Sequence, residues 1–136
     1  MANAAASIRV PASAENVWDL VGGFNSLPDW MPGVTTSELS EGGRLRSICL
    51  ESGEVSVERL EYFDNLGFTY SYSITRGAFP VTDYFSIFTV QPDGENASIV
   101  EWSGEFTAKG VTTQEAEEIF LGFYEDSLES LKAKFV

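Results

Sequence analysis

Two charged residues, Arg46 and Glu58, occur in short segments that otherwise alternate between polar and apolar residues. Residues two apart on a strand point to the same face. Arg46 therefore shares a face with Ile48, and Glu58 shares one with Leu60 and Tyr62. A guanidinium can hold an anion and a carboxylate can move a proton. This chemistry would suit proton abstraction, isomerisation, dehydration or cyclisation of a small carbonyl or thio compound.

Two tyrosines extend this candidate set. Tyr72 and Tyr84 lie on neighbouring predicted strands, and their hydroxyl groups would serve as hydrogen-bond donors to a developing oxyanion. We therefore predict catalytic roles for Arg46, Glu58, Tyr72 and Tyr84.

A second arrangement of the charged pair remains open. Arginine and glutamate on adjacent strands commonly form solvated cross-strand contacts, which stabilise a sheet by only about 0.2–1 kcal/mol. If Arg46 and Glu58 instead point inward, they must pair with each other, because an unpaired buried charge costs several kcal/mol. Whether the two side chains converge inside the protein decides between these arrangements.

The residues that the chain lacks exclude several kinds of site. There is no histidine, which excludes Ser–His and Cys–His nucleophilic pairs, zinc sites built on imidazole, and histidine acid–base chemistry. The single cysteine, Cys49, excludes an intrachain disulfide and a cysteine-rich metal site. We predict no metal and no cofactor.

The net charge of −13 limits the partners of the protein. An acidic surface repels phosphate backbones and anionic lipids, so we predict no nucleic-acid and no membrane partner. No stretch approaches the roughly 20 apolar residues that span a bilayer, and residues 2–6 lack the features of a signal peptide. The sequence thus favours a cytoplasmic protein, a monomer or weak homodimer, in one domain over residues 1–136.

Hydrophobic periodicity predicts an α+β fold. A first strand is followed by two short helices, then by six strands with short connections, and last by a long helix. Such connections favour an antiparallel meander. In the long helix, Thr112 and Glu115 form a candidate capping box. The predicted strands cover residues 4–10, 34–39, 44–50, 55–63, 68–74, 81–90 and 98–106, and the predicted helices lie within residues 13–21, 24–30 and 112–135.

Several segments together resemble the START-like superfamily, also called SRPBCC or polyketide cyclase/dehydrase proteins. They are residues 10–18 (VPASAENVW), 30–33 (WMPG), 57–60 (VERL), 70–74 (YSYSI), 79–84 (FPVTDY) and 100–102 (VEW). The resemblance implies the helix-grip fold, in which a seven-stranded antiparallel sheet wraps around a long C-terminal helix and leaves an internal cavity. Residues 43–46 and 57–60 also resemble the branch that includes lachrymatory factor synthase, whose cavity arginine and glutamate would correspond to Arg46 and Glu58.

We therefore expect a mostly apolar cavity that binds a small hydrophobic molecule between the sheet and the long helix. Two functions are compatible with it: a cofactor-independent cyclase, dehydratase or isomerase, and a non-catalytic carrier or sensor. A partner-binding subunit, the third possibility, would have no closed cavity. The predicted ligand-binding residues are Trp30, Ile48, Leu60, Tyr70, Ile74, Ser86, Phe88, Trp102, Phe120 and Phe123.

Overall fold

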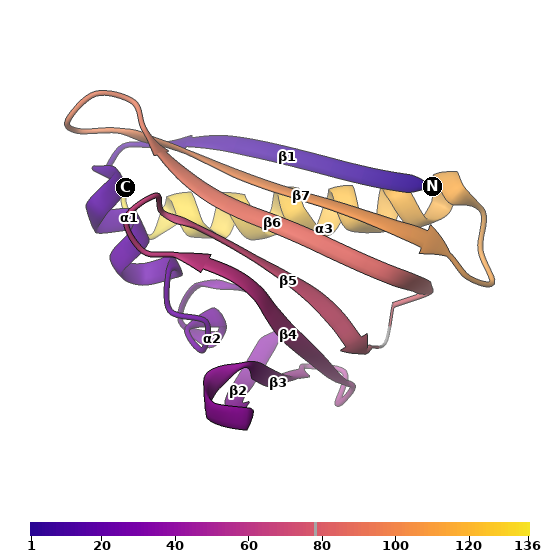
Figure 1. Cartoon of the computed structure of the whole chain (residues 1–136). Coiled ribbons are helices and arrows are strands. Elements are labelled where there is room, and N and C mark those ends of the chain that lie inside the picture. Colours follow the sequence, from indigo (N-terminus) through magenta and orange to yellow (C-terminus); the bar gives the residue numbers. More distant parts are fainter. Residues whose placement is uncertain (78) are drawn as a thin grey trace.

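The computed structural model describes residues 1–77 and 79–136 and has the predicted α+β architecture. Strand β1 precedes two short helices, and strands β2 to β7 precede the long helix α3 (Figure 1). Within the described residues, one 3₁₀ turn, η1, links β2 and β3. The elements are β1 (Ala2–Val10), α1 (Ala14–Val21), α2 (Leu27–Trp30), β2 (Val34–Ser40), η1 (Glu41–Gly43), β3 (Leu45–Leu50), β4 (Val55–Asp64), β5 (Thr69–Arg76), β6 (Val81–Pro92), β7 (Ser98–Ala108) and α3 (Thr113–Ala133).

The seven strands form one antiparallel sheet in the order β1-β7-β6-β5-β4-β3-β2. Strands β2 to β7 are a meander, and β1 pairs with the last strand, β7. Helices α1 and α2 connect the two edges of the sheet, and α3 runs across one face of it (Figure 1). We call the face that α3 covers the inner face. This is the helix-grip arrangement that the sequence predicts.

Side-chain caps begin two of the helices where the sequence indicates. The Ser13 hydroxyl accepts a hydrogen bond from the Asn16 amide at the start of α1. At the start of α3, Thr112 accepts from the Glu115 amide at 3.1 Å, and the Glu115 carboxylate accepts from the Thr112 amide at 3.1 Å. The capping box is therefore confirmed, and it fixes the residue at which α3 begins.

Among the register irregularities of the sheet, two β-bulges bear on the predicted inward-facing side chains. The extra residue in β6 follows Thr82, and beyond it Tyr84, Ser86 and Phe88 are all buried, as predicted. The extra residue in β4 lies between Leu60 and Tyr62. This bulge reverses the alternation, so Tyr62 is exposed and the prediction that it shares a face with Glu58 is wrong.

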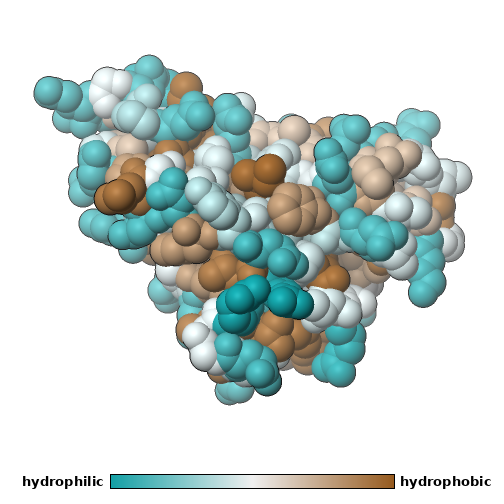
Figure 2. All heavy atoms as spheres, in the orientation of Figure 1, coloured by the Kyte–Doolittle hydropathy of each residue, from teal (hydrophilic) through white to brown (hydrophobic). Residues whose placement is uncertain are grey.

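The core lies between the inner face and α3. The Phe120 ring of α3 lies 4.7 Å from that of Phe106 and 5.0 Å from that of Tyr84, and the Tyr124 ring stacks on Trp102 at 4.6 Å. On the opposite face of the sheet, hydrophobic residues are interspersed with hydrophilic ones (Figure 2). In the described part of the chain, no helix has the length and apolar character needed to cross a bilayer.

Candidate functional site

Arg46 and Glu58 form an ion pair inside the protein. They are directly opposite each other in the register of β3 and β4, and both point to the inner face. Arg46 Nε donates to Glu58 Oε1 at 2.8 Å, and Arg46 Nη2 lies 2.7 Å from the same oxygen. The residues are 1% and 5% exposed. The structure therefore shows the inward, paired arrangement and not the solvated one.

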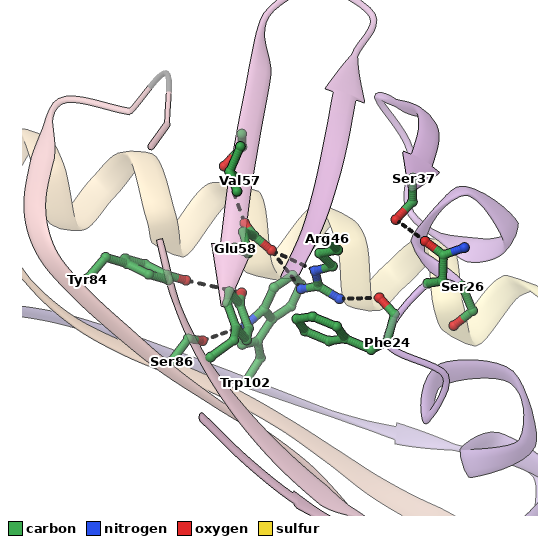
Figure 3. A network of polar contacts seen from close by, with 12 residues as sticks. Phe24, Ser26, Ser37, Arg46, Val57, Glu58, Tyr84, Ser86 and Trp102 are labelled. Carbon is green, nitrogen blue, oxygen red and sulfur yellow. Dashed lines mark hydrogen bonds and ion pairs between the residues drawn. The ribbon is translucent and has the colours of Figure 1, made fainter. Parts of the chain in front are cut away.

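Further contacts hold the guanidinium in place. Arg46 Nη1 donates to the Phe24 carbonyl oxygen at 2.9 Å, which links β3 to the segment between α1 and α2 (Figure 3). The guanidinium carbon lies 4.2 Å from the ring centre of Phe24 and 4.8 Å from that of Tyr72. Rings at these distances stabilise a cation through their negative faces. The planar group is thus enclosed by aromatic rings and one carboxylate.

The charge state of Arg46 follows from two opposing effects. Burial on its own lowers the pKa of the guanidinium, but attraction to the Glu58 carboxylate and to the nearby tyrosines outweighs burial and raises the pKa. Arg46 is therefore a permanent cation at this position. The second carboxylate oxygen of Glu58, Oε2, has a long contact of 3.5 Å with the Ser56 hydroxyl. This oxygen therefore makes fewer close contacts than Oε1.

A second set of hydrogen-bonding groups lies beside the pair on the inner face. Trp102 Nε1 donates to Ser86 Oγ at 2.9 Å and to the Tyr72 hydroxyl at 3.2 Å. The Tyr72 hydroxyl lies 3.4 Å from that of Tyr84, which in turn lies 2.5 Å from that of Tyr124. The predicted residues Tyr72, Tyr84, Ser86 and Trp102 thus belong to one network, and Tyr124 joins it from α3.

Burial keeps these phenols protonated. It raises the pKa of Tyr72, to which the nearby Glu58 charge adds, and it raises the pKa of Tyr84. It also raises the pKa of Tyr124 to about 12. Near neutral pH all three therefore remain O–H donors, as the predicted role of Tyr72 and Tyr84 requires.

Tyr124 can join the network because residue 104 of β7 is a glycine. A Cβ atom at Gly104 would overlap the Tyr124 hydroxyl and would lie 3.3 Å from Cε2 of Tyr84. The helix can therefore bring its tyrosine against the strand backbone only if position 104 has no side chain.

Replacing Gly104 by Ala is expected to lower the free energy of unfolding by about 1–3 kcal/mol, the usual cost of overpacking a core. Urea denaturation measures this loss. The same substitution in a Tyr124→Phe background should cost clearly less, because the overlapping hydroxyl is absent. Equal losses in the two backgrounds would contradict this explanation.

The cavity beside the pair is small. Its volume is about 20 Å³, which is room for about one water molecule. A small organic molecule can enter only if the lining side chains move apart. The lining residues are Leu27, Met31, Arg46, Ile48, Leu50, Glu58, Tyr72, Ile74, Phe79, Tyr84, Trp102, Phe120 and Phe123.

The predicted residues divide into two groups. All four proposed catalytic residues line the cavity, as do the predicted ligand-binding residues Ile48, Ile74, Trp102, Phe120 and Phe123. The other predicted ligand-binding residues are not among the lining side chains: Trp30, Leu60, Tyr70, Ser86 and Phe88. Trp30, Tyr70 and Phe88 are buried in the aromatic core, where the Tyr70 and Phe88 rings stack at 5.6 Å.

Sequence reasoning missed six residues near this site, one of which, Leu50, shares a strand face with Arg46 and Ile48 and lines the cavity. Tyr124 follows Phe120 by four residues, so helical spacing would have placed it on the inner side of α3. Phe24, Leu27, Met31 and Phe79 lie in α2 or in irregular segments, where periodicity does not predict orientation. Within residues 1–77 and 79–136, no group of three or more His, Cys, Asp and Glu residues is arranged to hold a metal ion.

Comparison with protein families identifies the fold. A family model described as polyketide cyclase / dehydrase and lipid transport matches residues 1–136. The chain belongs to this family. A START superfamily protein from Mycobacterium smegmatis, 18% identical, shares the fold of this polyketide cyclase/dehydrase family member with a TM-score of 0.82 over 98% of this chain and 96% of its own.

Two Bacillus structures are much more similar to this family member. A protein from Bacillus thuringiensis is 44% identical, with a TM-score of 0.97 over 98% of each chain. The protein XoxI from Bacillus cereus is 45% identical, with a TM-score of 0.97 over 99% of this chain and 96% of its own. The search of curated proteins found no match.

Proposed function

We propose that this family member binds a small, largely apolar organic molecule beside the Arg46–Glu58 pair and catalyses a cofactor-independent cyclisation, dehydration or isomerisation. One observation carries the proposal: a buried ion pair lies on the wall of an otherwise apolar and aromatic cavity. Apolar residues of similar volume would stabilise the fold as well or better. The family description, polyketide cyclase / dehydrase and lipid transport, supports the same class of reaction.

Each proposed residue has a defined role in this chemistry. Glu58, through Oε2, removes a proton from a carbon next to a carbonyl group of the ligand, and the electron pair of that C–H bond moves onto the carbonyl oxygen. Arg46 and the Tyr72 and Tyr84 hydroxyls stabilise the resulting oxyanion. Return of the proton from Glu58 to a different atom completes an isomerisation. Its delivery to a departing hydroxyl group releases water and completes a dehydration.

Entry of the ligand requires the cavity to open. Its lining includes both fully buried side chains, such as Phe120, and half-buried ones, namely Leu50, Ile74, Phe79 and Phe123. The half-buried group has solvent on one side, so its members can move with the smallest loss of packing. A ligand that binds the open state better than the closed one shifts the population toward it.

Non-catalytic carriage of the same kind of ligand is the second candidate function. It is favoured by the hydrogen bond from Arg46 Nη1 to the Phe24 carbonyl oxygen, which gives the arginine a structural task. In that case Glu58 neutralises Arg46 and moves no proton. The two candidates share the cavity and differ in what happens to the ligand.

The test begins with the protein purified from its host and the identification by mass spectrometry of any small molecule that remains bound. With that molecule as substrate, Glu58→Gln is expected to lower turnover by about 10²–10⁴-fold, the usual contribution of a general acid or base. Arg46→Leu removes the oxyanion partner and should also reduce turnover. The matched control is Glu101→Gln, at an exposed glutamate on the opposite face of the sheet.

The outcomes separate the candidates. Loss of turnover in Glu58→Gln and Arg46→Leu, with Glu101→Gln unaffected, supports the enzyme. Turnover that persists unchanged in both variants contradicts the catalytic assignment. A bound molecule that is released unaltered establishes the carrier, and a protein that binds no organic molecule contradicts both.

A further inference from the structure

The side chains that line the cavity carry no net charge. Two of the described residues that line it are charged, Arg46 and Glu58, and they are paired with each other. The polar groups beside them, the hydroxyls of Tyr72 and Tyr84 and the indole N–H of Trp102, carry no charge. The remaining lining side chains are aliphatic or aromatic. The positive charge of Arg46 is therefore already balanced before any ligand arrives.

A ligand anion would meet unfavourable surroundings here. It would lose its hydration on entry, and the charge on Glu58 would repel it. The single positive charge of Arg46 is already balanced by Glu58 Oε1, at 2.8 Å from Nε and 2.7 Å from Nη2, so it cannot also neutralise a ligand anion. A neutral carbonyl or hydroxyl oxygen incurs a much smaller loss of hydration and still accepts a hydrogen bond from the tyrosine hydroxyls or the guanidinium.

We propose that the site selects uncharged ligands that carry a hydrogen-bond-accepting oxygen and that it excludes carboxylates of the same shape. This inference rests on the proposed binding of an organic molecule in this cavity and specifies the class of molecule. Glu58 is then the residue that determines specificity, because its charge makes the site neutral.

Two probes of nearly the same size test the inference. Acetophenone carries a neutral methyl ketone on a benzene ring, and benzoate carries a carboxylate in the same position. Their dissociation constants are measured with the full chain at pH 7.5 by ¹H–¹⁵N chemical-shift titration, which also reports whether the backbone amides of Ile48, Tyr72 and Trp102 respond. We expect acetophenone to bind more tightly than benzoate by about tenfold or more. The free energy needed to bury an uncompensated charge is larger than the free-energy difference that corresponds to a tenfold change in dissociation constant.

Charge variants show whether Glu58 causes the preference. Glu58→Gln leaves a site with one positive charge, and the preference for acetophenone should fall at least about tenfold or reverse in favour of benzoate. Arg46→Met combined with Glu58→Gln restores a net charge of zero, so the preference for acetophenone should remain. The double variant carries no unpaired buried charge, and it therefore provides a second measurement if Glu58→Gln does not fold.

Each outcome has a distinct meaning. Benzoate binding at these amides as tightly as acetophenone would overturn the inference while leaving the proposed ligand binding intact. An unchanged preference in folded Glu58→Gln, or a preference for benzoate in the double variant, would also overturn it. If neither probe shifts these amides, the inference and the proposed binding function fail together.

Discussion

Replacing Arg46 by Met, or Glu58 by Gln, is expected to lower the free energy of unfolding by about 3–5 kcal/mol, because each change leaves the other charge buried without its partner. This loss is a large part of the stability of a typical domain, about 5–15 kcal/mol. Urea denaturation at 25 °C measures it. In the double variant neither charge remains, so the combined loss should be smaller than the sum of the single losses by about 2–3 kcal/mol.

The chain contains a matched control for this experiment. Arg9 and Asp93 form an ion pair of the same length, 2.7 Å, but their side chains are 64% and 44% exposed. Replacing Arg9 by Met should cost at most about 1 kcal/mol, because water and salt screen an exposed pair. If the Arg9 and Arg46 substitutions cost the same, burial does not control the energy of these pairs. Additive losses in the Arg46 and Glu58 variants would show that the two residues do not act as a pair.

Alkaline pH is expected to destabilise the protein through Tyr72, Tyr84 and Tyr124. Burial raises the pKa of each phenol above that of the unfolded chain, and that of Tyr124 reaches about 12. Above about pH 10 the unfolded chain therefore loses these protons while the folded protein keeps them. The stabilisation is fully present below pH 10 and is lost as the pH rises toward the folded-state pKa values. Each tyrosine contributes a slope of at most about 1.4 kcal/mol per pH unit.

Urea denaturation at fixed pH values from 8 to 12 measures this dependence. Tyr84→Phe and Tyr124→Phe each remove one of the three ionisations, so each should reduce the slope above pH 10. The range from pH 8 to 9 is the internal control, because these phenols are protonated there in both states. A slope above pH 10 that is identical in wild type and both variants would contradict the assignment.

The sequence predicted the placement of the Arg46–Glu58 pair more accurately than the size of the cavity beside it. Alternation along β3 and the first half of β4 correctly placed Arg46, Ile48 and Glu58 on one face, because the ladder between these two strands is regular. The same rule failed at Tyr62, since a bulge adds one residue and no turn residue marks it in the sequence. A two-residue period is informative only as long as the hydrogen-bond ladder is uninterrupted.

The volume of the cavity could not be predicted, because it depends on how side chains from separate elements fill the same space. Phe79 follows β5 and lies 4.9 Å from Phe120 of α3, ring centre to ring centre. Nothing in the local sequence of either residue specifies this contact. The sequence predicted a space for an organic molecule, whereas the structure shows room for about one water molecule until the side chains move.

The pairing of β1 with β7 has a consequence for how the protein is made. Ala6 of β1 lies opposite Trp102 of β7, so the first strand of the chain obtains its neighbour only when the last strand is available. During synthesis the β2–β6 meander can form from local contacts, while β1 remains unpaired until most of the chain has left the ribosome. Closing so long a loop is entropically costly, and high contact order slows folding. We expect docking of β1 to be a late event that completes the domain.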